Sequence, residues 1–254
     1  MRIVMTRLFI FCLLLFGQFS FGQANDSAFG KPIFWYQISD PWSMFMGAEG
    51  PVFVLYDSGK VLYRKNNVYR LVQVDPEEKE LLITGLNLKD TLFIKSRNYN
   101  ATASAGQTDM VGATDNPTYS MFVNFDTLIQ VSVYGYITAI EYRKKFPKPF
   151  LKAHIVIMNY ENDNAVKWVP GKVQVLLSDY ENSPDIPVKW PKDWPDLNSP
   201  EAINEDGYLK SIFLDGKYLD ELIKLINNRH EKQAFEINGG RYYIGYRFPI
   251  PGLY

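Results

Sequence analysis

Short runs of apolar, β-branched and aromatic residues recur along most of the chain, and polar turn residues separate them. Runs of this kind between Gly, Pro, Asn, Asp or Ser are typical of β-strands. The clearest pair flanks Asp57-Ser58-Gly59, where Gly59 is free to take the positive φ that closes a three-residue hairpin loop. The pattern predicts strands over residues 33–38, 52–56, 60–64, 68–74, 119–123, 129–134, 173–177, 208–214 and 242–248.

Three segments favour helices. The first begins at Asp75, a suitable N-cap, continues with Pro76 and two glutamates, and ends near Gly85. In residues 217–229, apolar side chains fall on one helical face and charged side chains on the other. Residues 150–160 are ambiguous, because their β-branched residues favour a strand whereas the length of the run and Pro149 favour a helix. We predict a helix there.

Two stretches lack a regular apolar pattern. Residues 95–118 are dominated by Ser, Asn, Ala, Thr and Gly, and a loop of this length is usually either functional or disordered; the composition leaves both open. Residues 182–200 form a proline-rich connector. The expected fold class is α+β, an antiparallel β-sheet built from hairpins and covered by a few helices. We expect one α+β domain over residues 23–254, with two subdomains at about 30–145 and 150–254 as the alternative.

The N-terminus has the pattern of a secretory signal peptide. Arg2 and Arg7 precede the apolar run Leu8–Phe16, and small residues end the segment at Ser20 and Gly22. The run of about nine residues is much shorter than the roughly 20 that a membrane-spanning helix needs. The pattern predicts a signal peptide over residues 1–22, cleavage near Gly22-Gln23, and an exported mature protein without a membrane span, either periplasmic or secreted.

The rest of the composition excludes several classes of partner. Cys12 is the only cysteine and lies in the predicted signal peptide, so the mature chain is expected to form no internal disulfide, which is ordinary in a bacterial periplasm. The formal net charge of −1 lacks the basic excess of a nucleic-acid binder. With two histidines and no mature cysteine, the usual structural zinc site cannot form, and the sequence indicates no cofactor.

No motif assigns a catalytic residue. The chain has no G-x-S-x-G elbow, no S-x-x-K pair and no H-E-x-x-H helix. His154 lies in an apolar run and His230 at a predicted helix end, where structural roles are expected. A pair of acids in a cleft could still hydrolyse a glycan, and the acids closest to turns or to the long loop are Asp109, Asp115, Asp179 and Asp185.

Aromatic residues and the long loop supply the candidate binding residues. Trp190 and Trp194 each precede a proline in the connector, with Trp168 and Tyr180 upstream. Displayed indole rings could stack on sugar rings or dock a peptide, whereas buried ones would hold the connector against the sheet, and the second reading is favoured. In the long loop, Asp109, Asp115 and neighbouring hydroxyl groups could line a ligand site, or the loop could simply be solvated.

Several short motifs follow one another in a particular order. Residues 55–61 (LYDSGKV) precede the helix that starts Pro76-Glu77-Glu78, residues 114–118 lead into residues 131–135 (VSVYG), and Trp-Pro pairs follow. In this order the chain resembles uncharacterised exported proteins of bacteria, over about residues 50 to 200. The resemblance implies an exported bacterial setting, implies no activity, and supplies no site residue.

The function expected from these observations is that of a non-enzymatic binding or interaction protein of the bacterial envelope or exterior, whose partner is a protein or a glycan. One alternative is a carboxylate-dependent hydrolase that acts on carbohydrate. Another is an inhibitor or immunity-type protein that blocks a partner with a rigid loop. An enzyme should bring acids together in a pocket, whereas an aromatic binder should expose Trp190 and Trp194.

Overall fold

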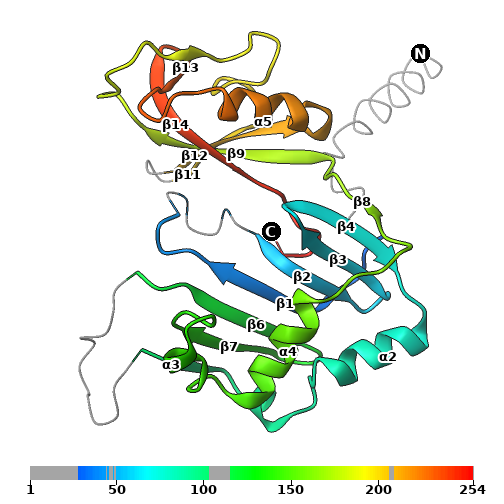
Figure 1. Cartoon of the computed structure of the whole chain (residues 1–254). Coiled ribbons are helices and arrows are strands. Elements are labelled where there is room, and N and C mark those ends of the chain that lie inside the picture. Colours follow the sequence, from blue (N-terminus) through cyan, green and yellow to red (C-terminus); the bar gives the residue numbers. More distant parts are fainter. Residues whose placement is uncertain are drawn as a thin grey trace, which may run out of the picture.

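The computed structural model describes residues 28–43, 45, 48, 50–102, 115–205 and 209–253, with backbone alone at 204, 205 and 209. The predicted signal peptide and Asp109 lie outside these residues. Two mostly antiparallel sheets and a few helices make up the fold, which confirms the α+β class. Figure 1 shows the two sheets one above the other, with the longer helices packed against them.

The larger sheet has eight strands in the order β5-β7-β6-β1-β2-β3-β4-β8, antiparallel except for β5 with β7. The predicted hairpin is confirmed as β2 and β3, and Gly59 between them has a φ of 85°. The strand bounds are β1 Pro32–Ser39, β2 Pro51–Tyr56, β3 Lys60–Lys65, β4 Val68–Gln73, β5 Arg97–Asn100, β6 Thr118–Asn124, β7 Leu128–Tyr134 and β8 Val166–Lys167.

Two helices, α2 (Pro76–Gly85) and α4 (Lys148–Met158), cover one face of the larger sheet (Figure 1). Helix α2 starts as predicted, because the Asp75 side chain accepts a 2.8 Å hydrogen bond from the backbone N–H of Glu78. The ambiguous segment is helical, which confirms that prediction. Its buried residues Phe150, Ala153 and Ile157 recur at helical spacing and join the core of the sheet. Short helices lie at η1 (Thr91–Ile94) and α3 (Ile140–Arg143).

The smaller sheet has six strands in the order β10-β13-β14-β9-β12-β11, with only β10 and β13 parallel. Helix α5 (Leu219–Asn227), preceded by η2 (Gly216–Tyr218), packs on one of its faces through buried Leu219 and Leu222. The strand bounds are β9 Lys172–Asp179, β10 Val188–Lys189, β11 Ala202–Glu205, β12 Leu209–Asp215, β13 Phe235–Ile237 and β14 Gly240–Arg247.

Two crossings of the chain join the sheets. The segment after β8 leads into β9, and β14 leads back from the upper sheet toward the lower one in Figure 1. The residues after β14 pack on the face of the larger sheet opposite α2 and α4, where Ile250 is buried with Phe29 and Val54. The Tyr56 hydroxyl donates a 3.0 Å hydrogen bond to the Pro251 carbonyl. The end of the chain is therefore part of the first sheet's core.

The stretch expected to be a loop over residues 95–118 is corrected at its start. Arg97–Asn100 form β5, which pairs in parallel with β7, and residues 103–114 lie outside the described residues. This strand carries no apolar alternation because it lies at the sheet edge with three of its four residues exposed. No helix within the described part of the chain is long and apolar enough to cross a membrane.

Candidate functional site

The candidate site is a cleft of about 570 Å³ on the smaller sheet, larger than the cavities of about 320 and 210 Å³ near the joint between the sheets. Three segments of the chain form it: the end of β9 and the residue after it, the segment after α5, and the middle of β14. The lining side chains are Ser178, Asp179, Tyr180, Arg229, Glu231, Lys232 and Tyr243.

Strand alternation places the cleft on the face of the sheet opposite α5. Tyr242 and Ile244 are buried in the core under α5, so Tyr243 between them points to the other face. Tyr243 pairs with Ser178 of β9. Phe45, from the segment between β1 and β2, stacks on the Tyr243 ring with centroids 6.0 Å apart. Phe45, which precedes β2 of the larger sheet, therefore helps to fix the Tyr243 ring of the smaller sheet.

Arg229 is held firmly at this cleft. Its Nη1 group donates hydrogen bonds to the carbonyl oxygens of His230, Glu231 and Gln233 at 3.3, 2.9 and 3.1 Å. Its guanidinium carbon lies 4.5 Å from the centroid of the Tyr243 ring, a cation–π contact. These contacts fix the orientation of the guanidinium group.

The charge of Arg229 is not matched by an acid. No carboxylate of the described residues lies within salt-bridge distance of it, and its buried Nε has no hydrogen-bond partner. A buried donor without an acceptor costs about 1–3 kcal/mol or more when it belongs to a charged group. Because Arg229 lines the cleft, its unmatched positive charge attracts a negatively charged group of a ligand.

The other charges of the cleft are partly compensated. Asp179 accepts a 3.1 Å bond from Lys210, and this hydrogen bond raises the pKa of Lys210 above its ordinary value. Lys210 also bonds to the Tyr242 hydroxyl at 3.3 Å. Once Asp179 is paired with Lys210, the lining retains Arg229 and Lys232 against the single carboxylate of Glu231. The cleft therefore has a small positive excess.

The indole rings of Trp190 and Trp194 are not displayed, and the favoured interpretation, burial against the sheet, is the one that the structure shows. Trp190 and Trp194 are only 8% and 7% exposed and belong to the core under α5. Their rings contact each other edge to face with centroids 5.2 Å apart, and the Trp190 indole donates a 2.9 Å bond to the Pro195 carbonyl. Both rings pack with the apolar residues of this core, as large aromatic side chains commonly do.

The remaining predicted binding residues are scattered. Tyr180 lines the cleft. Trp168 instead packs edge to face against Phe29 and Tyr69 at the joint between the sheets. Asp115 is exposed, with a φ of 73°, and precedes β6 in the larger sheet. Asp109 lies outside the described residues. Of the predicted candidates, the structure therefore places only Tyr180 and the candidate acid Asp179 in the cleft.

Sequence reasoning missed Arg229 and Tyr243. Arg229 follows a helix, where a cation is expected simply to complement the helix dipole. Tyr243 lies in a strand, where an aromatic side chain is expected for packing alone. The available signal was the alternation of β14, which places the aromatic ring of Tyr243 on the face opposite buried Tyr242 and Ile244.

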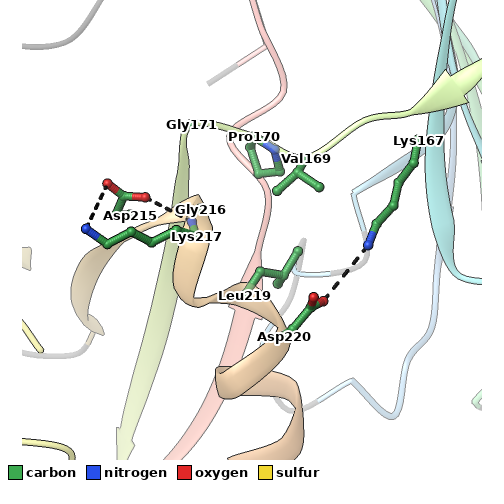
Figure 2. A pocket seen from close by; sticks show the side chains of 9 residues that line it. All are labelled: Lys167, Val169, Pro170, Gly171, Asp215, Gly216, Lys217, Leu219 and Asp220. Carbon is green, nitrogen blue, oxygen red and sulfur yellow. Dashed lines mark hydrogen bonds and ion pairs between the residues drawn. The ribbon is translucent and has the colours of Figure 1, made fainter.

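A second cavity, of about 320 Å³, lies between the end of β8 and the start of α5. Figure 2 shows its two ion pairs: Lys167 with Asp220 at 4.0 Å, and Lys217 with Asp215 at 3.8 Å. Because each lysine already faces an aspartate of the same cavity, these charges offer less to a ligand than Arg229 does. We therefore take the Arg229 cleft as the candidate site.

Neither histidine belongs to the cleft. The His154 Nδ1 lies 2.7 Å from the Tyr36 hydroxyl, within the core of the larger sheet. Burial, with a smaller contribution from the positive charge of Arg143, lowers the pKa of His154 to about 4. The ring is thus neutral at pH 7 and shares one hydrogen bond with the Tyr36 hydroxyl. Among the described residues, no three of His, Cys, Asp and Glu gather where they could hold a metal ion.

The residues of the cleft are not close together in the sequence. They come from three separate segments of the chain, so no short motif marks the cleft. Comparison of the chain with protein-family models, with curated proteins and with solved structures found no match.

Proposed function

We propose that this chain is an exported, non-enzymatic binding protein of the bacterial envelope or exterior, and that its ligand occupies the Arg229 cleft. The observation that carries the proposal is the guanidinium group of Arg229, which three carbonyls and the Tyr243 ring hold in place without an acidic partner. The resemblance to exported bacterial proteins and the pattern of residues 1–22 support the location.

The arrangement of aromatic and charged residues in the cleft supports a role in ligand binding. Its aromatic walls, Tyr180 and Tyr243, flank charged groups, and its floor is a hydrogen-bonded sheet. Ligand sites commonly combine apolar or aromatic walls with a few fixed polar groups on a rigid scaffold. The carbohydrate hydrolase alternative needs one carboxylic acid to protonate the glycosidic oxygen and a second carboxylate that attacks the sugar or activates a water molecule. In this cleft Asp179 is engaged by Lys210 instead.

An array experiment tests the proposal. The mature chain, residues 23–254, is labelled and applied to glycan and peptide arrays beside Arg229→Gln, with Arg70→Gln as a matched control. Arg70 is an exposed arginine of β4 outside the cleft. We expect a set of bound compounds that Arg70→Gln retains and Arg229→Gln loses. Binding that both variants retain equally, or no binding by the wild type, would contradict the proposal.

Arg229→Gln also removes the bonds to three carbonyls, so its fold must be checked. The circular dichroism spectrum and the urea midpoint of the variant are compared with those of the wild type. Arg229→Lys is the second variant, because lysine keeps the positive charge and loses the planar fork of donors. We expect Arg229→Lys to remain folded and to bind the selected compounds about tenfold more weakly, a loss of about 1.4 kcal/mol.

One observation favours the inhibitor alternative as a second function. Ile186 lies between Pro184 and Pro187 with 85% of its surface exposed. The base of this loop is fixed by Ser183, whose hydroxyl donates to the Lys232 carbonyl at 2.7 Å. The Gln233 amide likewise donates to the Ile186 carbonyl at 2.7 Å. A rigid loop with an apolar tip suits insertion into a partner's pocket.

A substitution at the tip tests this second function. Ile186→Asp should abolish capture of a partner from an envelope extract, because the aspartate would have to be buried in an apolar pocket. Ile140→Asp is the matched control, since Ile140 of α3 is also strongly exposed. If both variants capture the same proteins as the wild type, the loop has no part in binding.

A further inference from the structure

Helices α3 and α4 concentrate positive charge on one part of the surface. Residues 127–160 hold a single acid, Glu141, whereas the whole chain has a formal net charge of −1. The cations of the same stretch are Arg143, Lys144, Lys145, Lys148 and Lys152. All of them are exposed, and Arg143, Lys144, Lys148 and Lys152 form no ion pair within the described part of the chain.

Helical spacing turns the lysines of α4 away from the sheet. The buried residues of α4 recur at positions 150, 153 and 157 and face the core. A residue two positions from a buried one lies on nearly the opposite side of a helix. Lys148, Lys152 and Ile155 all occupy such positions, so they share the outer face of α4.

Helix α3 adds to the same side of the molecule. Tyr142 packs partly buried on the core of the larger sheet, and Lys144 follows it by two positions. The rings of Phe146, just after α3, and Phe150 of α4 lie 6.0 Å apart, so the two helices are close neighbours. Figure 1 shows both on the same face of the larger sheet, and their outer sides therefore point away from it together.

The outer face of α4 also carries apolar side chains. Ile155 and Met158 each expose 45% of their surface. They are three positions apart, and Ile155 follows Lys152 by three, so these side chains are neighbours along the helix. The face is therefore basic in the first half of α4 and apolar in the second half.

We infer that this basic-apolar face docks the protein on the surface of a bilayer that contains anionic lipids. The face consists of Arg143, Lys144, Lys148, Lys152, Ile155 and Met158. Negative headgroups complement the cations, and the apolar side chains enter the boundary between headgroups and acyl chains. A polyanion dissolved in water would use the cations alone and leave Ile155 and Met158 in water. The Arg229 cleft lies on the smaller sheet, so docking is independent of it.

Co-sedimentation of the mature chain with vesicles tests the inference. The vesicles consist of phosphatidylcholine alone or with about 30% phosphatidylglycerol as the anionic lipid. The first variant is Lys148→Gln/Lys152→Gln. Its matched control, Lys172→Gln/Lys192→Gln, removes the same charge from exposed positions outside the face. The second variant, Ile155→Asp, keeps the cations and changes the apolar part, and circular dichroism checks the fold of each variant.

We expect the wild type and the control pair to sediment with the anionic vesicles and to remain in solution with the neutral ones. Added salt should weaken the binding, because it screens exposed charges. Lys148→Gln/Lys152→Gln should bind about 30-fold more weakly, since each basic residue near an anionic surface contributes about fivefold. Ile155→Asp should bind at least about tenfold more weakly, because a carboxylate cannot enter the apolar boundary without loss of hydration.

Four outcomes would overturn the inference: no sedimentation with anionic vesicles, equal sedimentation with neutral vesicles, an equal loss in the control pair, or unchanged binding of Ile155→Asp. The last result would indicate a site for a soluble polyanion. A dimer of the mature chain that Ile155→Asp dissociates would instead show that a second copy covers the face. Arg229→Gln should bind the vesicles as the wild type does, so this result and the array result for the cleft can fail separately.

Discussion

His154 lies between Tyr36 and Tyr119 on the side of α4 that faces the larger sheet. The same desolvation that lowers the pKa of His154 raises the pKa of Tyr36, so both groups stay neutral and share one hydrogen bond. Arg229 differs from His154 because its guanidinium group is always protonated. It therefore keeps its positive charge although no acidic side chain pairs with it. At the residue scale, surroundings therefore make one basic side chain structural and leave the other available to a ligand.

The depressed pKa of His154 predicts a loss of stability in acid. The folded pKa of about 4 lies below the ordinary value of 6.5, so the unfolded chain binds the proton first as the pH falls. The contribution of His154 is therefore complete above pH 6.5 and is lost as the pH falls toward 4. The full shift would correspond to at most about 3.4 kcal/mol, and solvent screening of the partly exposed ring reduces this to about 1–2 kcal/mol.

Urea unfolding at pH 7 and pH 4 measures this loss, with His154→Asn as the reference because asparagine does not titrate. The wild type should lose about 1–2 kcal/mol more than the variant between the two pH values. An NMR titration of the His154 ring gives the pKa directly. A midpoint near 6.5 in the folded protein would contradict the desolvated environment.

At the element scale, the joint between the sheets depends on close backbone contact. The Gly216 N–H donates a 2.8 Å hydrogen bond to the Gly171 carbonyl, so the start of η2 lies against the segment that enters β9. A Cβ atom at Gly216 would collide with the carbonyl oxygen of Pro170, whereas one at Gly171 would meet nothing within 4 Å. A side chain at Gly216 therefore requires the backbone to move, whereas a side chain at Gly171 does not.

This difference predicts a matched pair of variants. Gly216→Ala should lower the free energy of unfolding by about 1–3 kcal/mol, because backbone atoms must move to admit the methyl group. Gly171→Ala should change it by no more than about 0.5 kcal/mol. Urea denaturation followed by tryptophan fluorescence compares the two. Equal losses in both variants would show that η2 does not pack on the Pro170 segment as described.

At the scale of the whole molecule, the elements were largely predictable and the site was not. Local chemistry marks the hairpin at Gly59 and the helix start at Asp75, so both follow from neighbouring residues. The two-residue strand β10 forms because β13, which lies far along the chain, pairs with it. The cleft needs residues 178–180, 229–232 and 243 together, and that proximity is a property of the folded sheet.

The predicted signal peptide makes a further claim about the whole molecule. When the full chain is expressed in a bacterium, residues 1–22 should be removed and the protein should be recovered from the periplasm or the medium. N-terminal sequencing of the recovered protein should begin at or near Gln23. A cytoplasmic protein that retains Leu8–Phe16 would refute the export prediction.

The most direct test of the Arg229 cleft as the binding site is backbone chemical-shift mapping of the mature chain with the strongest-binding compound from the arrays. The largest changes should fall on Ser178, Tyr180, Arg229, Lys232 and Tyr243, which line the cleft from three separate segments. Changes confined to the joint cavity around Lys167 and Asp220, or to the larger sheet, would contradict the account.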